Sequence, residues 1–245
     1  MTTEPAVATR PTVQPDRLRR PLGTDRDVRR RLVRHHLPLA AASGLSLVVF
    51  VALSPSHRGL ALPRYVVATG YLAFALLALT LLVGPANLLL GRRNPANSYL
   101  RRDIGMWTVL ASAAHVILAF QVGHASGSFR FVGFFVAGGR PLTSRFGLGN
   151  WTGLAALVIA VGLLAISTDR TLRELKVRRW KSLQRLNYAL PPLVAVHAYF
   201  YGALSPMSPF RTVLVIDVVA ILVGQAVGMW LWRRTSSRDP VRPSG

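Results

Sequence analysis

Long apolar stretches separated by short polar segments run through most of this chain. A helix needs about 20 mostly apolar residues to cross a hydrocarbon core of about 30 Å. Six stretches meet that requirement: Leu37–Leu53, Tyr65–Leu90, Ile104–Gly123, Trp151–Thr168, Leu183–Leu204 and Val213–Trp232. Because unpaired backbone groups cannot face lipid, apolar stretches of this length predict helices. The pattern therefore predicts an all-α polytopic membrane protein, a six-transmembrane-helix bundle.

Composition supports a membrane protein and argues against a soluble one. Hydrophobic residues make up 51% of the 245 and charged residues only 16%, which is too apolar for one or two soluble domains. The chain is also strongly basic, with 30 Lys and Arg against 9 Asp and Glu. These basic residues lie in short clusters between the apolar stretches rather than along one face. The expected partner is therefore the lipid bilayer and not a nucleic acid.

The distribution of basic residues predicts the orientation. Of the 30 Lys and Arg residues, 23 precede the first stretch, follow the last, or lie in the second and fourth connections, whereas only six lie in the other three connections. By the positive-inside rule, we expect a multi-pass protein of the cell membrane with cytoplasmic N- and C-termini. Residues 1–36 then form a disordered basic cytoplasmic tail, 37–232 the six-helix domain and 233–245 a cytoplasmic tail.

An alternative interpretation concerns the first apolar stretch. The run Arg29-Arg30-Arg31, followed by an apolar segment ending in Ala52-Leu53-Ser54, weakly resembles a twin-arginine signal. Cleavage there would remove the first helix and leave an odd number of spans. We therefore favour the six-helix interpretation.

Three local patterns bear on the connections and on the fifth stretch. Thr171-Leu172-Arg173-Glu174 matches a capping box and predicts a short interfacial helix between the fourth and fifth spans. Phe131–Ala137 is too short to cross a membrane and is interpreted as an interfacial piece of an outer loop. Pro191-Pro192 removes two backbone donors, and we expect it to kink the fifth span just before His197.

Three ionisable residues lie within the predicted spans, and such residues are functional candidates because their burial in lipid is costly. They are His115, His197 and Asp217. At about 1.5 Å per residue, His115 and His197 lie roughly 16 and 21 Å from the cytoplasmic face, so the two imidazoles can share one level in the outer half. Asp217 lies in the outer third of the sixth span, where we expect it to have a partner or to handle protons, or to be a hydrogen-bonded structural acid.

Two imidazoles at one depth suit the axial ligation of a haem that stands between two helices. Ala111 and Ser112, one turn before His115, are small and leave room for a planar group. The alternative is that each histidine is a polar residue hydrogen-bonded to a neighbouring helix. With no cysteine, the chain can supply no thiolate ligand, iron–sulfur cluster or covalently attached haem.

The other four histidines are weaker candidates. His35 and His36 adjoin the basic tail and are expected to be solvated. His57 lies in the first outer loop. His124 lies at the outer end of the third span and is a reserve candidate for a ligand.

Several segments, in this order and spacing, resemble the ferric reductase-like transmembrane domain family. They are Gly84-Pro85-Ala86-Asn87 through Asn94-Pro95, Leu100-Arg101-Arg102-Asp103-Ile104-Gly105 leading to His115, and Leu172-Arg173-Glu174-Leu175 through Asn187-Tyr188 leading to His197. The family includes eukaryotic ferric reductases, NADPH oxidases and the haem-binding membrane subunit of the bacterial methionine-sulfoxide reductase system. The bacterial subunit is the closest of these in size.

The resemblance implies a haem b whose iron is bound by His115 and His197, in a subunit that transfers electrons as part of an oxidoreductase. Members of the family commonly have a histidine where this chain has Gln184, thirteen residues before His197, so a second haem near the cytoplasmic face is not carried over. No catalytic residue is assigned. The rival hypothesis is a haem-free transporter or structural membrane protein with a polar path lined by His115, His197 and Asp217.

The sequence shows no glycine-rich βαβ pattern for a flavin or a nicotinamide. We therefore expect electrons to come from a separate donor, either a quinol or a flavoprotein, with the quinone or FMN bound non-covalently. The expected acceptor is a separate enzyme or a metal ion on the outer side.

Overall fold

A computed structural model of the chain describes residues 29–53, 62–91, 99–125, 131–168, 171, 174–205, 208 and 210–236. The chain divides into two compact units, residues 1–38 and 39–245. The described part of the first unit is helical and includes a π-helical segment, η2 (Leu32–His36). Residues 1–28 of the predicted basic tail and His57 lie outside the described residues.

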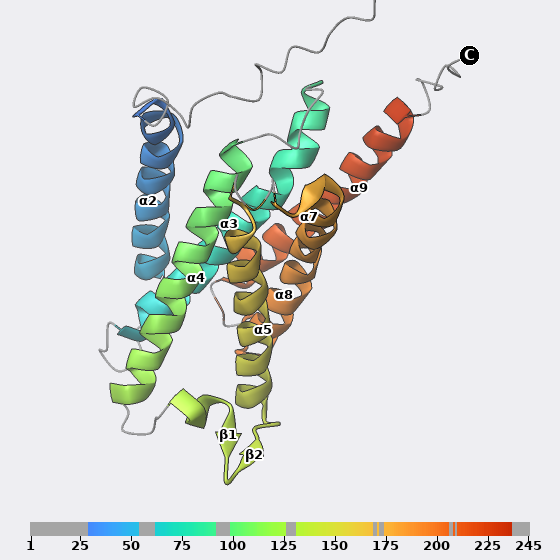
Figure 1. Cartoon of the computed structure of the whole chain (residues 1–245). Helices are drawn as coiled ribbons and strands as arrows, with labels where there is room; N and C mark the ends of the chain where they lie inside the picture. Colours follow the sequence, from blue (N-terminus) through green and yellow to red (C-terminus); the bar gives the residue numbers. More distant parts are fainter. Residues whose placement is uncertain are drawn as a thin grey trace, which may run out of the picture. The chain divides into compact units, whose positions relative to one another are not determined.

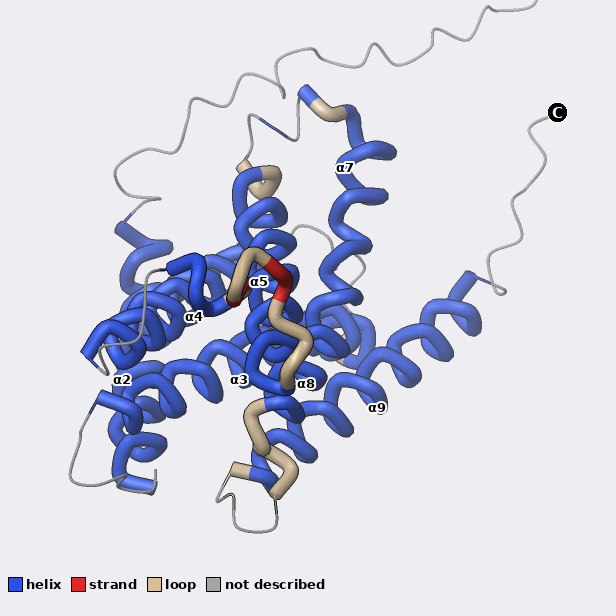
Figure 2. Tube along the Cα trace, turned by 90° about the horizontal axis from the view of Figure 1, so that it is seen from below, coloured by secondary structure: helices blue, strands red, loops and turns tan. Residues whose placement is uncertain are grey.

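The second unit is built almost entirely from helices (Figure 1). They are α2 (Leu37–Leu53), which begins at the end of the first unit, α3 (Leu62–Leu89), α4 (Tyr99–Ala125), α5 (Arg145–Ala165), α7 (Lys176–Gln184), α8 (Leu190–Phe200) and α9 (Arg211–Ser236), with the 3-10 segments η4 (Phe131–Phe134) and η5 (Arg185–Ala189). In the described residues, strand is confined to one small hairpin of β1 (Val136–Ala137) and β2 (Arg140–Pro141), red in Figure 2.

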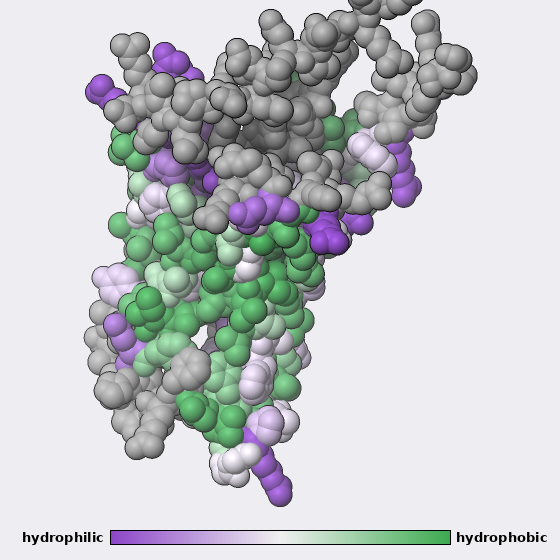
Figure 3. Space-filling model, in the orientation of Figure 1, coloured by the Kyte–Doolittle hydropathy of each residue, from purple (hydrophilic) through white to green (hydrophobic). Residues whose placement is uncertain are grey.

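The helices confirm the predicted all-α membrane fold. Five helices of the described residues are long and apolar enough to cross a membrane, namely those within Arg29–Leu53, Pro63–Leu89, Leu100–Val122, Arg145–Ala165 and Arg211–Arg234. On the face shown in Figure 3, hydrophobic residues cover the middle of the helices and hydrophilic ones gather toward the ends. The chain is therefore an integral multi-pass membrane protein.

The fifth predicted span, Leu183–Leu204, is not one continuous helix. Pro191 and Pro192 lie in the first turn of α8, where a helix needs no backbone donor. Their missing N–H groups cannot bond to the carbonyls of residues 187 and 188, and the chain there tightens into η5, with Leu190 N–H donating to Asn187 O. The prolines therefore begin α8 where the 3-10 segment η5 ends, and the expected kink just before His197 stays a prediction.

The predicted linker helix is present: Thr171 and Glu174 of the capping box are helical, and α7 follows after a bend at Leu175. α7 begins at Lys176, and its N-cap residue Leu175 makes no side-chain cap hydrogen bond. Residues 172 and 173 of the capping box lie outside the described residues. The segment Phe131–Ala137 forms η4 and β1, which is consistent with a piece too short to cross a membrane.

α3 is the central helix and packs against α4 on one side and α9 on another. Pro85 lies inside α3 and has no N–H for the carbonyl of Leu81 four residues earlier. Gln225 of α9 satisfies that carbonyl, because its Nε2 donates to Leu81 O at 2.9 Å. Gly224 and Gly228 lie against Leu82 and Pro85 of α3, so that close approach of the two helices depends on small residues at these positions.

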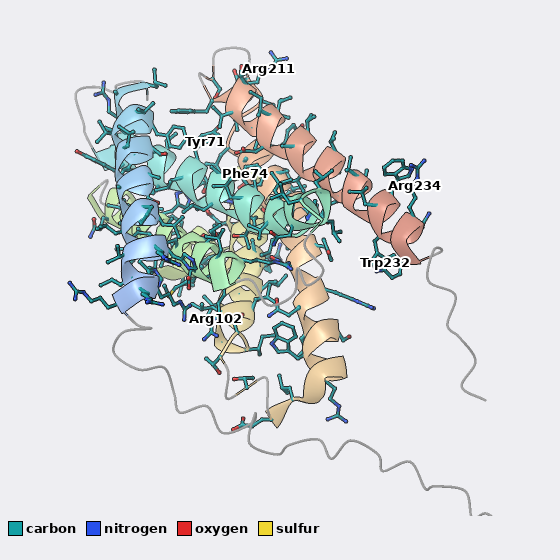
Figure 4. All side chains as sticks on the ribbon, turned by 90° about the horizontal axis from the view of Figure 1, so that it is seen from above. Tyr71, Phe74, Arg102, Arg211, Trp232 and Arg234 are labelled. Atoms are coloured by element: carbon teal, nitrogen blue, oxygen red, sulfur yellow. The ribbon has the colours of Figure 1, made fainter. Side chains whose placement is uncertain are left out.

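An aromatic cluster joins α2, α3 and the residue before α9. The ring of Phe210, which is 2% exposed, lies 4.4 Å from Tyr71 and 5.7 Å from Phe50 between centroids. Tyr71 lies in this region in Figure 4, and Arg211 and Arg234 mark the two ends of α9. The guanidinium of Arg234 stacks 3.6 Å above the ring of Trp230. A basic residue beside an aromatic ring at the end of an apolar helix is typical of a membrane interface.

Candidate functional site

The structure brings His115 and His197 together. His115 lies in α4 and His197 in α8, and the centroids of their imidazole rings are 6.1 Å apart with the ring planes inclined at 84°. α4 and α8 are not among the closely packed helix pairs, so the two side chains bridge the space between them. The matched depth predicted from the sequence is thus found in the structure.

His115 is fixed against α3. Its Nδ1 lies 2.8 Å from the main-chain oxygen of Val66. Gly70, one turn further along α3, makes room for the ring, because a Cβ atom at that position would lie 3.0 Å from both Cε1 and Nδ1 of His115. The orientation of this imidazole is therefore set by main-chain atoms of α3 rather than by a charged side chain.

His197 is fixed in the same way against α5. Its Nδ1 lies 2.7 Å from the main-chain oxygen of Gly149. Gly153, again one turn further along, leaves space that a Cβ atom would fill, at 2.7 Å from Nδ1 and 2.9 Å from Cε1 of His197. Both histidines thus pair with a carbonyl at one position of a neighbouring helix and with a glycine four residues later.

This arrangement is what a metal-binding histidine needs. A carbonyl oxygen can only accept, so the neutral imidazole carries its proton on Nδ1 and keeps a lone pair on Nε2. An imidazole nitrogen binds a metal ion at about 2 Å and the ring centre lies about 1 Å further on, so an ion between two imidazoles separates their centroids by about 6 Å. The observed 6.1 Å fits an iron held between the two Nε2 atoms.

A tyrosine lies against the ring of His197. The ring centroid of Tyr201, one turn after His197, lies 5.0 Å from that of the imidazole. The Tyr201 hydroxyl donates to Oδ1 of Asn150, and Nδ2 of Asn150 donates to the main-chain oxygen of Phe134 at 2.9 Å. Tyr201 is 52% exposed, so it connects the buried imidazole with the surface of the protein.

Asp217 is placed apart from the histidine pair. It lies on α9, and none of the hydrogen bonds and ring contacts described for either imidazole involves it. Its Oδ2 is buried and has no hydrogen-bond partner among the described residues, so the expected partner of that atom is not found there. The polar path of the rival hypothesis is therefore not supported by the described contacts.

The remaining candidates belong to other parts of the chain or are not described. His35 and His36 belong to η2 in the first unit. His124 lies in α4, but its side chain is outside the described part of the chain. Gln184, at the position where the family commonly has a histidine, ends α7, and its Nε2 donates to Ser167 Oγ at 3.3 Å, just after the end of α5.

The sequence analysis did not identify the residues that hold the two histidines in place. The signal that could have indicated them is the dipeptide Thr-Gly, which occurs only twice in the sequence, at Thr69-Gly70 and Thr152-Gly153. Each occurrence lies one turn after the carbonyl that holds a histidine. A repeat of only two residues is too short to be recognised before the helices are seen side by side.

Comparison with known proteins shows the family to which this chain belongs. The family model "Ferric reductase like transmembrane component" matches residues 69–195, and the chain belongs to this family. The chain is also similar to two proteins described as "Protein-methionine-sulfoxide reductase heme-binding subunit MsrQ". The one from Ralstonia nicotianae is 30% identical over 167 residues, which is 68% of this chain and 70% of that protein. The one from Bordetella pertussis is 29% identical over 171 residues, 70% of this chain and 77% of that protein. No solved structure matches the chain.

Proposed function

We propose that this protein is a haem b-binding transmembrane subunit that carries electrons to an acceptor on the outer side of the membrane. The observation that carries the proposal is the histidine pair, with both Nδ1 atoms on main-chain oxygens and the ring centroids 6.1 Å apart. Membership of the ferric reductase family and similarity to subunits whose description includes haem binding support it.

His115 and His197 would hold the haem iron. When bound, the haem supplies one-electron redox chemistry. The main-chain oxygens of Val66 and Gly149 each accept a hydrogen bond from Nδ1–H and so leave Nε2 available to a metal, while Gly70 and Gly153 let the rings lie close to α3 and α5. α3 and α5 thus fix the orientation of the histidines that α4 and α8 carry.

We further propose one haem, in the outer half, with a donor that reaches it from within the membrane. Gln184 cannot replace a histidine ligand, and its side chain is engaged by Ser167 at the end of α5. The described residues around this position contain no histidine. A quinol, or a flavoprotein with a bound flavin, would therefore have to deliver electrons without an inner haem as an intermediate.

The acceptor would be a separate enzyme or a metal ion outside. Tyr201, which contacts the ring of His197 and is half exposed, gives a connection from the site toward the surface. The name of the relatives, a subunit of a protein-methionine-sulfoxide reductase, favours an acceptor enzyme. The bias of basic residues supports cytoplasmic termini, and with that orientation Tyr201 would lie on the outer side.

Absorption spectroscopy of the purified full-length chain tests the proposal. We expect a Soret band and, after reduction, the α and β bands of a low-spin haem b. His115→Ala and His197→Ala should each lose most of the haem, because removal of an axial ligand leaves the iron with one protein bond.

His35→Ala and His36→Ala are matched controls and should keep the haem, since both residues lie in η2. A colourless protein from haem-sufficient cells would support the rival haem-free transporter. Full haem content in both His115→Ala and His197→Ala would exclude these residues as ligands.

A further inference from the structure

The carbonyl that holds His115 is shared with a threonine. Thr69 Oγ1 lies 3.0 Å from Val66 O, the same atom that Nδ1 of His115 approaches, and 2.7 Å from Tyr65 O. Within α3, Val66 O also faces the N–H of Gly70 four residues later. The hydroxyl has one proton, which it shares between Tyr65 O and Val66 O, so Val66 O accepts from Nδ1–H, from the helical N–H and in part from the hydroxyl.

The carbonyl that holds His197 is shared in the same way. Thr152 Oγ1 lies 2.9 Å from Gly149 O, on which Nδ1 of His197 also lies, and 2.9 Å from Leu148 O. The helical donor to Gly149 O is the N–H of Gly153. We call this combination of a carbonyl, a threonine three residues later and a glycine four residues later a Thr-Gly notch.

The two Thr-Gly notches occupy equivalent places in the fold. Val66 is the fifth residue of α3 and Gly149 is the fifth residue of α5. Each notch receives a histidine from the helix that packs against it, α4 on α3 and α8 on α5. Two unrelated hydroxyls would not be expected at matching positions beside both histidines, so the repetition indicates a common role.

The hydroxyl affects how strongly the carbonyl binds the imidazole. A hydrogen bond from Nδ1–H raises the basicity of Nε2 as a metal ligand. A second donor on the same oxygen draws on the same electron density and weakens that bond. The threonine therefore makes Nε2 a weaker donor to the metal than it would be on an unshared carbonyl.

We propose that Thr69 and Thr152 are positioning residues that raise the reduction potential of the bound haem by sharing the carbonyls of Val66 and Gly149. This inference depends on the proposed haem ligation. A more basic Nε2 stabilises the ferric iron, which carries the higher charge. Loss of either hydroxyl should therefore favour the oxidised state and lower the potential.

The test is a spectroscopic redox titration of the purified full-length protein. Thr69→Val and Thr152→Val replace the hydroxyl with a methyl group of similar size. We expect both variants to keep their haem and to titrate at a lower reduction potential. The equilibrium constant for reduction should fall by up to about tenfold, which corresponds to about 59 mV for one electron. Thr69→Ser and Thr152→Ser keep the hydroxyl and should titrate like the unaltered chain.

Thr80→Val is the matched control. Thr80 is a buried threonine of α3 whose hydroxyl donates to Leu76 O at 2.8 Å, away from both notches. The haem of the Thr80→Val variant should have the same reduction potential as the haem of the unaltered protein. An equal shift in Thr80→Val would overturn the inference, as would unchanged potentials in haem-bearing Thr69→Val and Thr152→Val.

Two further outcomes separate this inference from the proposed function. A merely structural role would reduce haem content in the valine variants while the remaining haem kept its potential, and that result would overturn the inference alone. Absence of haem from the unaltered chain would overturn the proposed function and this inference with it.

Discussion

The imidazole rings of His115 and His197 stand nearly at right angles, at 84°, although each makes the same hydrogen bond to a helix carbonyl. The angle follows from the helices that carry the two carbonyls, because α3 and α5 fix one ring each. Neither ring is free to turn parallel to the other without losing its bond to Val66 or Gly149. The relative orientation of the ligands is therefore a property of the bundle.

The perpendicular rings predict an electron paramagnetic resonance signature. In a ferric haem with two perpendicular imidazoles, the two iron orbitals that interact with the ligand planes stay close in energy. We therefore expect a strongly anisotropic low-spin spectrum with one large principal g value. A rhombic spectrum typical of parallel imidazoles would show that the rings turn when the haem binds.

Gly153 should be intolerant of a methyl group. A Cβ atom there would lie 2.7 Å from Nδ1 of His197, so Gly153→Ala must displace the imidazole. We expect at least a several-fold lower haem content, measured as haem per chain after purification. Gly70→Ala should have a smaller effect, since its Cβ would lie 3.0 Å from the ring of His115.

Gly162→Ala is the control for this substitution on the same helix. Nothing lies within 4 Å of its Cβ position, and alanine is favoured over glycine in a helix by about 1 kcal/mol. Normal haem content is expected. Equal haem content in Gly153→Ala and Gly162→Ala would mean that the ring of His197 is not confined by α5.

Haem quantification should give one haem per chain. The prediction rests on Gln184, whose amide is hydrogen-bonded to Ser167 where the family commonly has a ligand. Gln184→Glu and Gln184→Leu should therefore keep the same haem content and the same potential. Two haems per chain, with the second lost on changing a cytoplasmic-side residue, would contradict a single-haem subunit.

Gln225 should contribute to stability because of Pro85. In Gln225→Leu, the carbonyl of Leu81 would be left without a donor inside the bundle, which costs about 1–3 kcal/mol. We expect a lower thermal midpoint in detergent. Pro85→Ala restores the helical N–H, so the loss caused by Gln225→Leu should be smaller in that background. Additive effects of the two substitutions would show that Gln225 does not serve this carbonyl.

The sequence was sufficient for the fold class and for the closeness of the two histidines, because both leave strong signals. A stretch of about 20 apolar residues has few alternatives to a helix, and an ionisable residue within such a stretch is conspicuous. The matched depth of His115 and His197 could be calculated from helix rise alone. Five of the six expected spans accordingly correspond to long helices.

The rest could not be predicted, because it depends on how the helices meet. Pro191 and Pro192 predicted a disturbance of the helix, but the sequence did not show that α8 begins there, directly after the 3-10 segment η5. The carbonyls of Val66 and Gly149 are main-chain atoms, which every residue possesses, so no pattern of side chains identifies them as partners of the histidines. Likewise, Gln225 is a recognisable polar residue, but its partner is a carbonyl exposed by a proline some 140 residues earlier.

The pairing of α3 with α4 and of α5 with α8 has a consequence for biogenesis. Each pair contains one histidine together with its own carbonyl and glycine, and one hydrophobic cluster, which includes Leu77 of α3, Ala156 of α5 and Leu190 of α8, joins the two pairs. Each pair can thus orient its own imidazole. If the proposed ligation holds, haem adds a further link between the pairs, and the chain from cells starved of haem should be inserted but more sensitive to protease than the haem-bound form.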